Sequence, residues 1–247
     1  MVKSSLSSPS QSASFLAASS LHSGDWLFAL PIASCGLRLD DEAVRVAVAL
    51  RLGLPLCVPH PCRCGSLVDA HGLHSFACKR APGRSARHHS LNDLSARAFA
   101  SAGIPAMKEP RSDGKRPDRL TLIPWQAGKA VTWDVTVVCP LADSYIHTAA
   151  QDAGAVAELA AARKTAKYAA LESRYIFQPV AVETLGPING STSAVSFLSG
   201  LGRRTADVSG ESREGNFLFH RLIVSIQRFN AVLLHDCFVD EVAGHSS

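Results

Sequence analysis

Apolar positions along the chain follow the period of helices in some segments and that of strands in others. Between residues 87 and 103 apolar residues recur at helical spacing, and the segment ends at Gly103, a residue common just after a helix. The Ala-rich segment 153–175 has high helix propensity, and the long apolar segment 217–238 predicts a further helix. A helix is also expected over 39–56, capped by Asp40 or Asp41, with an apolar side made of Val44, Ala47, Val48 and Leu52.

Four extended segments accompany these helices. Three of them, 104–111, 118–125 and 130–138, precede the Ala-rich helix, and the fourth, 175–186, follows it. The segment 130–138 is dense in β-branched residues, as a central strand requires. The order of helix, three strands, helix and strand predicts an α/β fold, an αβββαβ core with a mixed sheet flanked by helices.

We expect five segments along the chain. Residues 1–22 form a Ser-rich leader that lacks the apolar core of a signal peptide, and we expect them to be disordered. A helical linker is expected over 23–56 and a small zinc-binding knuckle over 57–85. The αβββαβ core occupies 86–187, and a C-terminal helical segment covers 188–247.

The composition excludes some classes of protein. With 47% hydrophobic and 19% charged residues, the chain leaves little room for extensive disorder. No segment approaches the run of about 18 apolar residues that a membrane span needs, so we expect no membrane partner. Seven cysteines without an export signal indicate an intracellular protein with reduced thiols, and metal ligation where the thiols cluster. The cysteines outside the cluster are expected in the core: Cys35, Cys139 and Cys237.

Soft metal ligands form that cluster. Four of them lie within 17 residues, separated by one, nine and three residues: Cys62, Cys64, His74 and Cys78. Thiolates and an imidazole at this density predict a tetrahedral structural Zn²⁺ site. The first spacing is tighter than in most zinc fingers, so one ligand could come from a neighbouring residue: Cys57, His60 or His71. The alternative is a pair of buried thiols with surface histidines.

Two aspartates fall on neighbouring predicted strands. If these strands form a hairpin whose pairing is centred near residue 126 or 127, Asp118 lies opposite either Asp134 or Thr136. Side chains alternate along a strand, so both registers place Asp118 and Asp134 on one face. Neighbouring carboxylates repel unless a cation lies between them, and this predicts a Mg²⁺ or Mn²⁺ site. The alternative is that Asp118 ends a turn after Pro117 and Asp134 pairs with an arginine.

Basic residues are concentrated between positions 78 and 119. This window holds ten Lys or Arg against four Asp or Glu, a local charge of +6, whereas the whole chain has a formal net charge of +4. A basic segment on a nearly balanced chain favours a polyanion partner. The alternative is a solvated charged surface.

Four short motifs together resemble the PD-(D/E)XK restriction-endonuclease-like superfamily. They are RPD at 116–118, WDVTV at 133–137, RKTAKY at 163–168 and AVETLG at 181–186. In that superfamily a lysine usually stands two residues after the second acid, where this chain has Thr136. Endonucleases of certain site-specific non-LTR retrotransposons take the lysine from the next helix, in a K-x-x-K-Y setting. The matching residues here are Lys164, Lys167 and Tyr168.

The same retrotransposon proteins carry a Cys-Cys-His-Cys knuckle followed by an Arg-His step, which Arg87 and His88 match. The resemblance implies a nuclear DNA endonuclease, the C-terminal portion of an element protein, with DNA and element RNA as partners. It implies that Asp118 and Asp134 bind Mg²⁺ or Mn²⁺ and that Lys164 or Lys167 positions the attacking water. The residues expected to bind phosphates are Arg84, Arg87, His88, Lys115 and Arg116, and further candidates for the site are Glu109, Tyr168 and Glu183.

Two other functional classes fit the same sequence. One is a zinc-dependent nucleic-acid-binding relic without nuclease activity, which Thr136 favours because it replaces the usual lysine. The other is a purely structural α/β domain. Nicking of a plasmid in the presence of Mg²⁺ separates an endonuclease from both.

Overall fold

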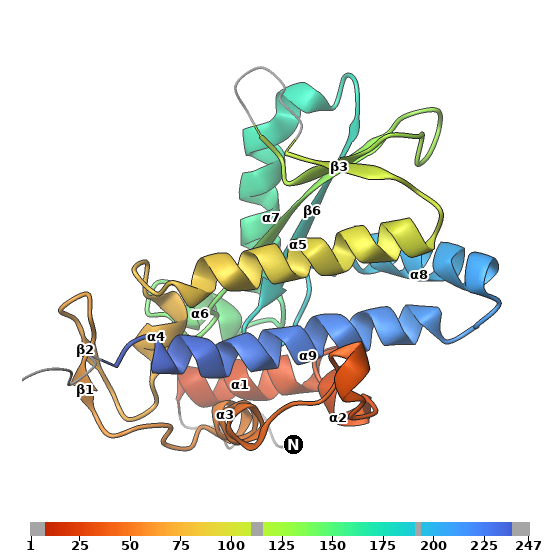
Figure 1. The fold of residues 1–247 in the computed structure, drawn as a ribbon. Coiled ribbons are helices and arrows are strands. Elements are labelled where there is room, and N and C mark those ends of the chain that lie inside the picture. Colours follow the sequence, from red (N-terminus) through yellow and green to blue (C-terminus); the bar gives the residue numbers. More distant parts are fainter. Residues whose placement is uncertain (1–7, 110–115, 191–193, 239–247) are drawn as a thin grey trace, which may run out of the picture.

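A four-stranded sheet, ordered β3-β4-β5-β6, lies beside layers of helices (Figure 1). The computed structural model describes residues 8–109, 116–190 and 194–238. β3 pairs with β4 and β4 with β5 in antiparallel fashion, whereas β5 and β6 are parallel, so the sheet is mixed. The strands are β3 (Ala106–Lys108), β4 (Arg119–Thr121), β5 (Val131–Val138) and β6 (Ile176–Glu183).

Two long helices complete the predicted order of elements. Helix α5 (Gly83–Ser101) precedes β3, and α7 (Ala155–Tyr168) connects β5 to β6. This confirms the order of helix, three strands, helix and strand. β4 is shorter than predicted because the Thr121 hydroxyl accepts the Val131 N–H (3.1 Å), so a side chain replaces strand pairing there. Short elements flank α7: α6 (Ile146–Ala149) and η3 (Ala169–Leu171).

The two faces of the sheet bury different residues. Trp133 and Val135 of β5 face the larger core, where Trp133 stacks on Phe99 of α5 with ring centroids 4.5 Å apart. On the opposite face, alanines of α7 pack against Ala181 of β6. Side chains alternate along β5, so Asp134 points to the α7 face. Small side chains let α7 lie close to the sheet, and its polar residues can reach that aspartate.

Residues before the sheet form helices that were only partly predicted. The expectation of a disordered leader over 1–22 is wrong for α1 (Pro9–Ser19), which contacts α3 and α6 and buries Ala13 and Ala17. Its N-terminus is capped by Ser8, whose hydroxyl accepts the Gln11 N–H (3.2 Å). The other elements of this region are α2 (Asp25–Phe28), η2 (Ala33–Cys35), α3 (Asp41–Leu52), β1 (His60–Pro61), β2 (Leu67–Val68) and α4 (Leu73–Ala77).

Helix α3 begins at its predicted cap but buries a different face. Asp40 accepts a hydrogen bond from the Ala43 N–H (2.7 Å), as expected of a cap. Of the predicted apolar side, Ala47 is buried, whereas Val44, Val48 and Leu52 are exposed. The pattern does not select a face because apolar residues lie all round this helix. Since α3 packs on α9, the segment 23–56 contributes to the core and is not a free linker. The buried face is Ala43, Val46, Ala47, Ala49 and Leu50.

Helix α9 (Glu214–His235) is the longest described helix, and α8 (Ala194–Ser209), α5, α4, α3 and α2 contact it. In Figure 1 it runs, in blue, alongside α5. It is the one described helix long and apolar enough to cross a membrane, but 67% of its apolar window is buried in the protein, which is typical of a core helix. Its buried Asn230 donates a hydrogen bond to the Thr184 carbonyl (2.8 Å), which ties the helix to the end of β6.

Glu183 ends β6 and caps the N-terminus of α7. Its Oε1 accepts the N–H groups of Val156 and Ala157, both at 3.1 Å. Burial raises the pKa of this carboxyl to about 7, although the two N–H groups favour the charged form. Asp134 pairs with Pro179, four residues, or about 13 Å, before Glu183 along β6. Glu183, a further candidate for the site of the two aspartates, instead caps α7.

Replacing Glu183 with Gln should remove a pH-dependent loss of stability. Because the folded protein holds this proton more tightly than the unfolded chain, the wild type loses free energy of unfolding as the pH rises from 4.5 to about 7. Glutamine keeps an oxygen for both N–H groups and carries no charge. Denaturant unfolding should show equal stability near pH 4.5 and an advantage of up to about 3 kcal/mol for E183Q at pH 8.

The exposed Glu172 provides the control, since E172Q should follow the wild-type profile. An advantage of E183Q that does not change with pH would contradict the assignment of the raised pKa to Glu183.

Candidate functional site

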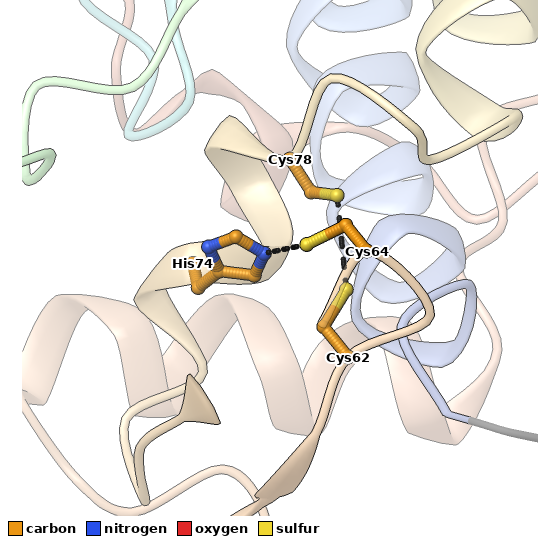
Figure 2. Close-up of side chains that lie close together, drawn as sticks. All are labelled: Cys62, Cys64, His74 and Cys78. Atoms are coloured by element: carbon orange, nitrogen blue, oxygen red, sulfur yellow. Dashed lines mark hydrogen bonds between the residues drawn. The ribbon is translucent and has the colours of Figure 1, made fainter. Parts of the chain in front are cut away.

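The Cys and His cluster forms a compact group where the β1–β2 hairpin meets α4 (Figure 2). The turn after β1 carries Cys62 and Cys64, α4 carries His74, and Cys78 ends α4. The potential ligand atoms of these four residues all lie within 4.8 Å of one another. Cys62 Sγ lies 3.7 Å from Cys78 Sγ, and Cys64 Sγ lies 3.1 Å from His74 Nε2.

These distances suit a metal ion such as zinc. Two thiolates bound to tetrahedral Zn²⁺ at about 2.3 Å have sulfur atoms about 3.8 Å apart, close to the 3.7 Å between Cys62 and Cys78. Hydrogen bonds from Ser66 lower the pKa of Cys64 to about 6, which favours the thiolate form that binds metals. The group is therefore able to bind a metal ion through three sulfur atoms and one nitrogen.

The alternative ligands have other contacts. The Cys57 thiol lies 3.3 Å from the Asp69 carbonyl, His60 stacks on Phe238, and His71 faces Asp69. Among the cysteines outside the cluster, Cys139 and Cys237 are buried as predicted, whereas Cys35 is exposed and the prediction that it belongs to the core is wrong. Cys35 ends the short η2 turn, where its side chain has no packing partner in the described core.

The β4–β5 pairing selects one of the two predicted registers. Arg119 pairs with Trp133 and Leu120 with Thr132, and this register, continued by one residue, places Asp134 opposite Asp118. The Asp118 N–H donates to the Trp133 carbonyl at 3.0 Å, which holds Asp118 against β5 next to the last regular pair, Arg119 with Trp133. Directly opposed residues of antiparallel strands project to the same face, so the two carboxylates share the α7 side of the sheet.

Both carboxylates are compensated by neighbouring groups. Asp134 is 3% exposed, and its Oδ1 accepts a hydrogen bond from Lys164 Nζ of α7 at 2.5 Å. Asp118 Oδ2 accepts the Val135 N–H (2.7 Å), and Oδ1 lies 3.1 Å from His88 Nε2 of α5. Burial acts to raise the pKa of Asp118, but these two hydrogen bonds hold it below its ordinary value. The hydrogen bond between His88 and Asp118 also raises the pKa of His88 and favours its imidazolium form.

The two lysines of α7 have different positions. Lys164 contacts Asp134, whereas Lys167 Nζ lies 3.0 Å from the Tyr168 hydroxyl and 4.6 Å from the centre of its ring. Tyr168 is fully buried and donates a hydrogen bond to the Arg116 carbonyl (3.0 Å), just before Asp118. Burial and the charge of Asp134 raise the Tyr168 pKa above its ordinary value, so the phenol stays protonated. Geometry thus separates the two lysines that the sequence left equivalent.

The contact between His88 and Asp118 was not predicted, since His88 was expected only to bind phosphates. Asn92, one turn further along α5, also contacts His88 (3.2 Å), and the i, i+4 spacing of the two residues was a usable signal. His88, Asn92 and Glu109 line a cavity of about 250 Å³ beside Asp118.

The remaining candidates for the site lie in different places. The Glu109 carboxylate is exposed and faces Lys108 at 3.8 Å. Arg84 and Arg87 lie at the start of α5, Arg116 is exposed, and Lys115 is outside the described residues.

The geometry of these two sites is the basis for assigning a function. No protein-family model matches this chain, and no curated protein matches it. In the described part of the chain, the Cys and His cluster is the one group of three or more metal-ligating side chains. Among the described residues, Asp118 and Asp134 do not belong to any such group.

Replacing Cys78 with Ser should release the bound metal and destabilise the protein. A structural metal contributes its binding free energy to folding, so the loss in the free energy of unfolding should be at least about 3 kcal/mol. Metal analysis of the purified protein should show about one zinc per wild-type chain and much less in C78S. The exposed Cys35 gives the matched control, and C35S should retain zinc. Equal zinc content in C78S and the wild type would exclude Cys78 as a ligand.

Proposed function

We propose that this chain is a metal-dependent DNA endonuclease domain of the PD-(D/E)XK type, preceded by a zinc knuckle and similar to the endonucleases of site-specific non-LTR retrotransposons. The observation that supports this most strongly is the convergence of Asp118, Asp134 and Lys164. Asp118 directly precedes β4, Asp134 lies on the neighbouring β5, and a lysine from the following helix contacts Asp134 at 2.5 Å. The reaction is hydrolysis of a phosphodiester bond, which nicks DNA.

The donor atoms of the two aspartates fit Mg²⁺ or Mn²⁺. Mg²⁺ is usually bound by one or two carboxylates together with water and substrate phosphate oxygens, so two aspartates without a third acid are a sufficient protein contribution. In this structure Asp134 Oδ1 accepts a hydrogen bond from Lys164, and the positive charge of Lys164 balances the negative charge of the Asp134 carboxylate. When bound, such an ion lowers the pKa of a water molecule and stabilises the leaving oxygen.

The residues around the two acids have distinct roles in this proposal. Lys164, whose side chain is 25% exposed, donates hydrogen bonds at the place where negative charge develops on the phosphate. His88 and the Val135 N–H hold Asp118 in its charged form and fix its orientation. Tyr168 fixes the backbone of Arg116, two residues before Asp118. DNA is the partner that agrees with the local excess of basic residues, and the knuckle provides the second contact with it.

A nucleic-acid-binding relic without nuclease activity is the second candidate. The contact between Lys164 and Asp134 supports it, because the lysine occupies a carboxylate oxygen that a metal ion needs. Thr136 stands two residues after Asp134, where the related endonucleases usually have a lysine. The relic would bind DNA without nicking it at any Mg²⁺ concentration.

Substituting Asp134 and Lys164 tests the nuclease directly. D134N should abolish Mg²⁺-dependent nicking of a supercoiled plasmid, and K164Q should slow it by about 100-fold or more, because each removes a charge that acts on the reacting phosphate. DNA retention on a filter should change little in both variants.

The matched control is K167Q, one turn away on α7, which should lose less than about threefold in nicking rate. Omitting Mg²⁺, rather than adding a chelator, keeps the knuckle loaded with zinc during the comparison. Nicking by D134N at the wild-type rate would exclude Asp134 from the reaction, and binding without nicking by the wild type would favour the relic.

A further inference from the structure

A basic cavity of about 420 Å³ lies between the first turn of α5, the end of the knuckle and the second half of β5. No Asp or Glu of the described residues lines it. The polar side chains around it are Lys79, Arg84, Ser85, Arg87, His88, His89 and Thr136. Three permanent cations and two histidines around one small cavity produce a strongly positive potential.

Arg87 is the unusual member of this group. It is 3% exposed, and its Nη1 is buried without a hydrogen-bond partner in the described part of the chain. Burial and the neighbouring Arg84 lower its pKa to about 10, so it remains charged at neutral pH. A buried guanidinium nitrogen without a partner is costly, and no acidic side chain of the described residues forms an ion pair with Arg87. The cavity therefore offers an anion the compensation that the protein itself does not supply.

The position of this cavity relative to the aspartates is defined by two residues. His88 lines it and also contacts Asp118, while Thr136 lies on the same face of β5 as Asp134, about 7 Å further along the strand. β4 pairs with β5 at Thr132 and Trp133, and no strand among the described residues pairs with this edge of β5 beside Thr136, which lines the cavity. His88 therefore links the cavity to the aspartates.

We propose that this cavity binds one phosphate group of a nucleic-acid backbone, a neighbour of the phosphate held at Asp118 and Asp134. Arg87 donates a charge-assisted hydrogen bond through its unpartnered Nη1, and Arg84 and Lys79 supply charge. The placement beside a scissile phosphate rests on the proposed nuclease function. The binding of phosphate by Arg87 and its neighbours does not, since it needs neither Mg²⁺ nor cleavage.

Thermal unfolding with inorganic phosphate tests the anion site in the full, zinc-loaded chain. Millimolar phosphate in place of chloride at equal ionic strength should raise the melting temperature of the wild type. R87M should be at least as stable as the wild type in chloride, because it removes a buried unpaired charge, and should gain no stability from phosphate. A phosphate-dependent rise in R87M equal to that of the wild type would overturn the site.

Fluorescence anisotropy with a labelled oligonucleotide, in buffer without Mg²⁺ or Mn²⁺, tests whether the phosphate belongs to nucleic acid. R84Q and R87M should each bind the oligonucleotide about tenfold more weakly than the wild type. R84Q should also reduce, by about 0.7 to 0.9, the magnitude of the slope of the logarithm of the association constant against the logarithm of the salt concentration. R97Q removes the same charge from an exposed position further along α5 and should keep wild-type affinity.

If R87M does not fold, R84Q against R97Q decides the question in both assays. Stabilisation by inorganic phosphate with unchanged oligonucleotide affinity in R84Q would overturn the nucleic-acid assignment. Weakened binding in R84Q together with a wild type that does not nick DNA would keep this inference and overturn the nuclease.

Discussion

Two neighbouring carboxylates, Asp118 and Asp134, must be held in one sheet, and their charge determines which side chains surround them. The β4–β5 register places Asp118 and Asp134 on one sheet face, and Asp134 is almost completely buried. Their charges are tolerated because Lys164 and His88 approach from two different helices. The small residues of α7 serve the same purpose, since a helix with larger side chains on that face would hold Lys164 further from the sheet.

The knuckle and the sheet are held together by a shared core. Leu234 and Cys237, at the C-terminal end of α9, belong to the same hydrophobic cluster as Cys62 and Cys78. Helix α9 also packs along α5, whose first turns carry Arg87 and His88. The position of the metal-binding cluster is thereby coupled to that of the basic cavity and of Asp118. Loss of the metal should therefore affect the start of α5 as well as the knuckle.

The features predicted from sequence are those set by local periodicity. The order of elements and the shared face of the two aspartates follow from periods of 3.6 and 2, and the four ligands follow from their spacing. The choice of Lys164 over Lys167 depends on how α7 rotates against the sheet, and the buried face of α3 depends on its packing against α9. Neither is encoded locally. The contact between His88 and Asp118 joins residues 30 positions apart, and α1 depends on burial against α3 and α6.

Anomalous X-ray scattering from crystals of the zinc-loaded chain grown with Mn²⁺ would show whether Asp118 and Asp134 bind one ion together. We expect a manganese peak about 2.1 Å from a carboxylate oxygen of both Asp118 and Asp134, on the α7 side of the sheet, with Lys164 beside it. Carboxylates that point to opposite faces, or manganese bound only at sites away from both aspartates, would contradict it.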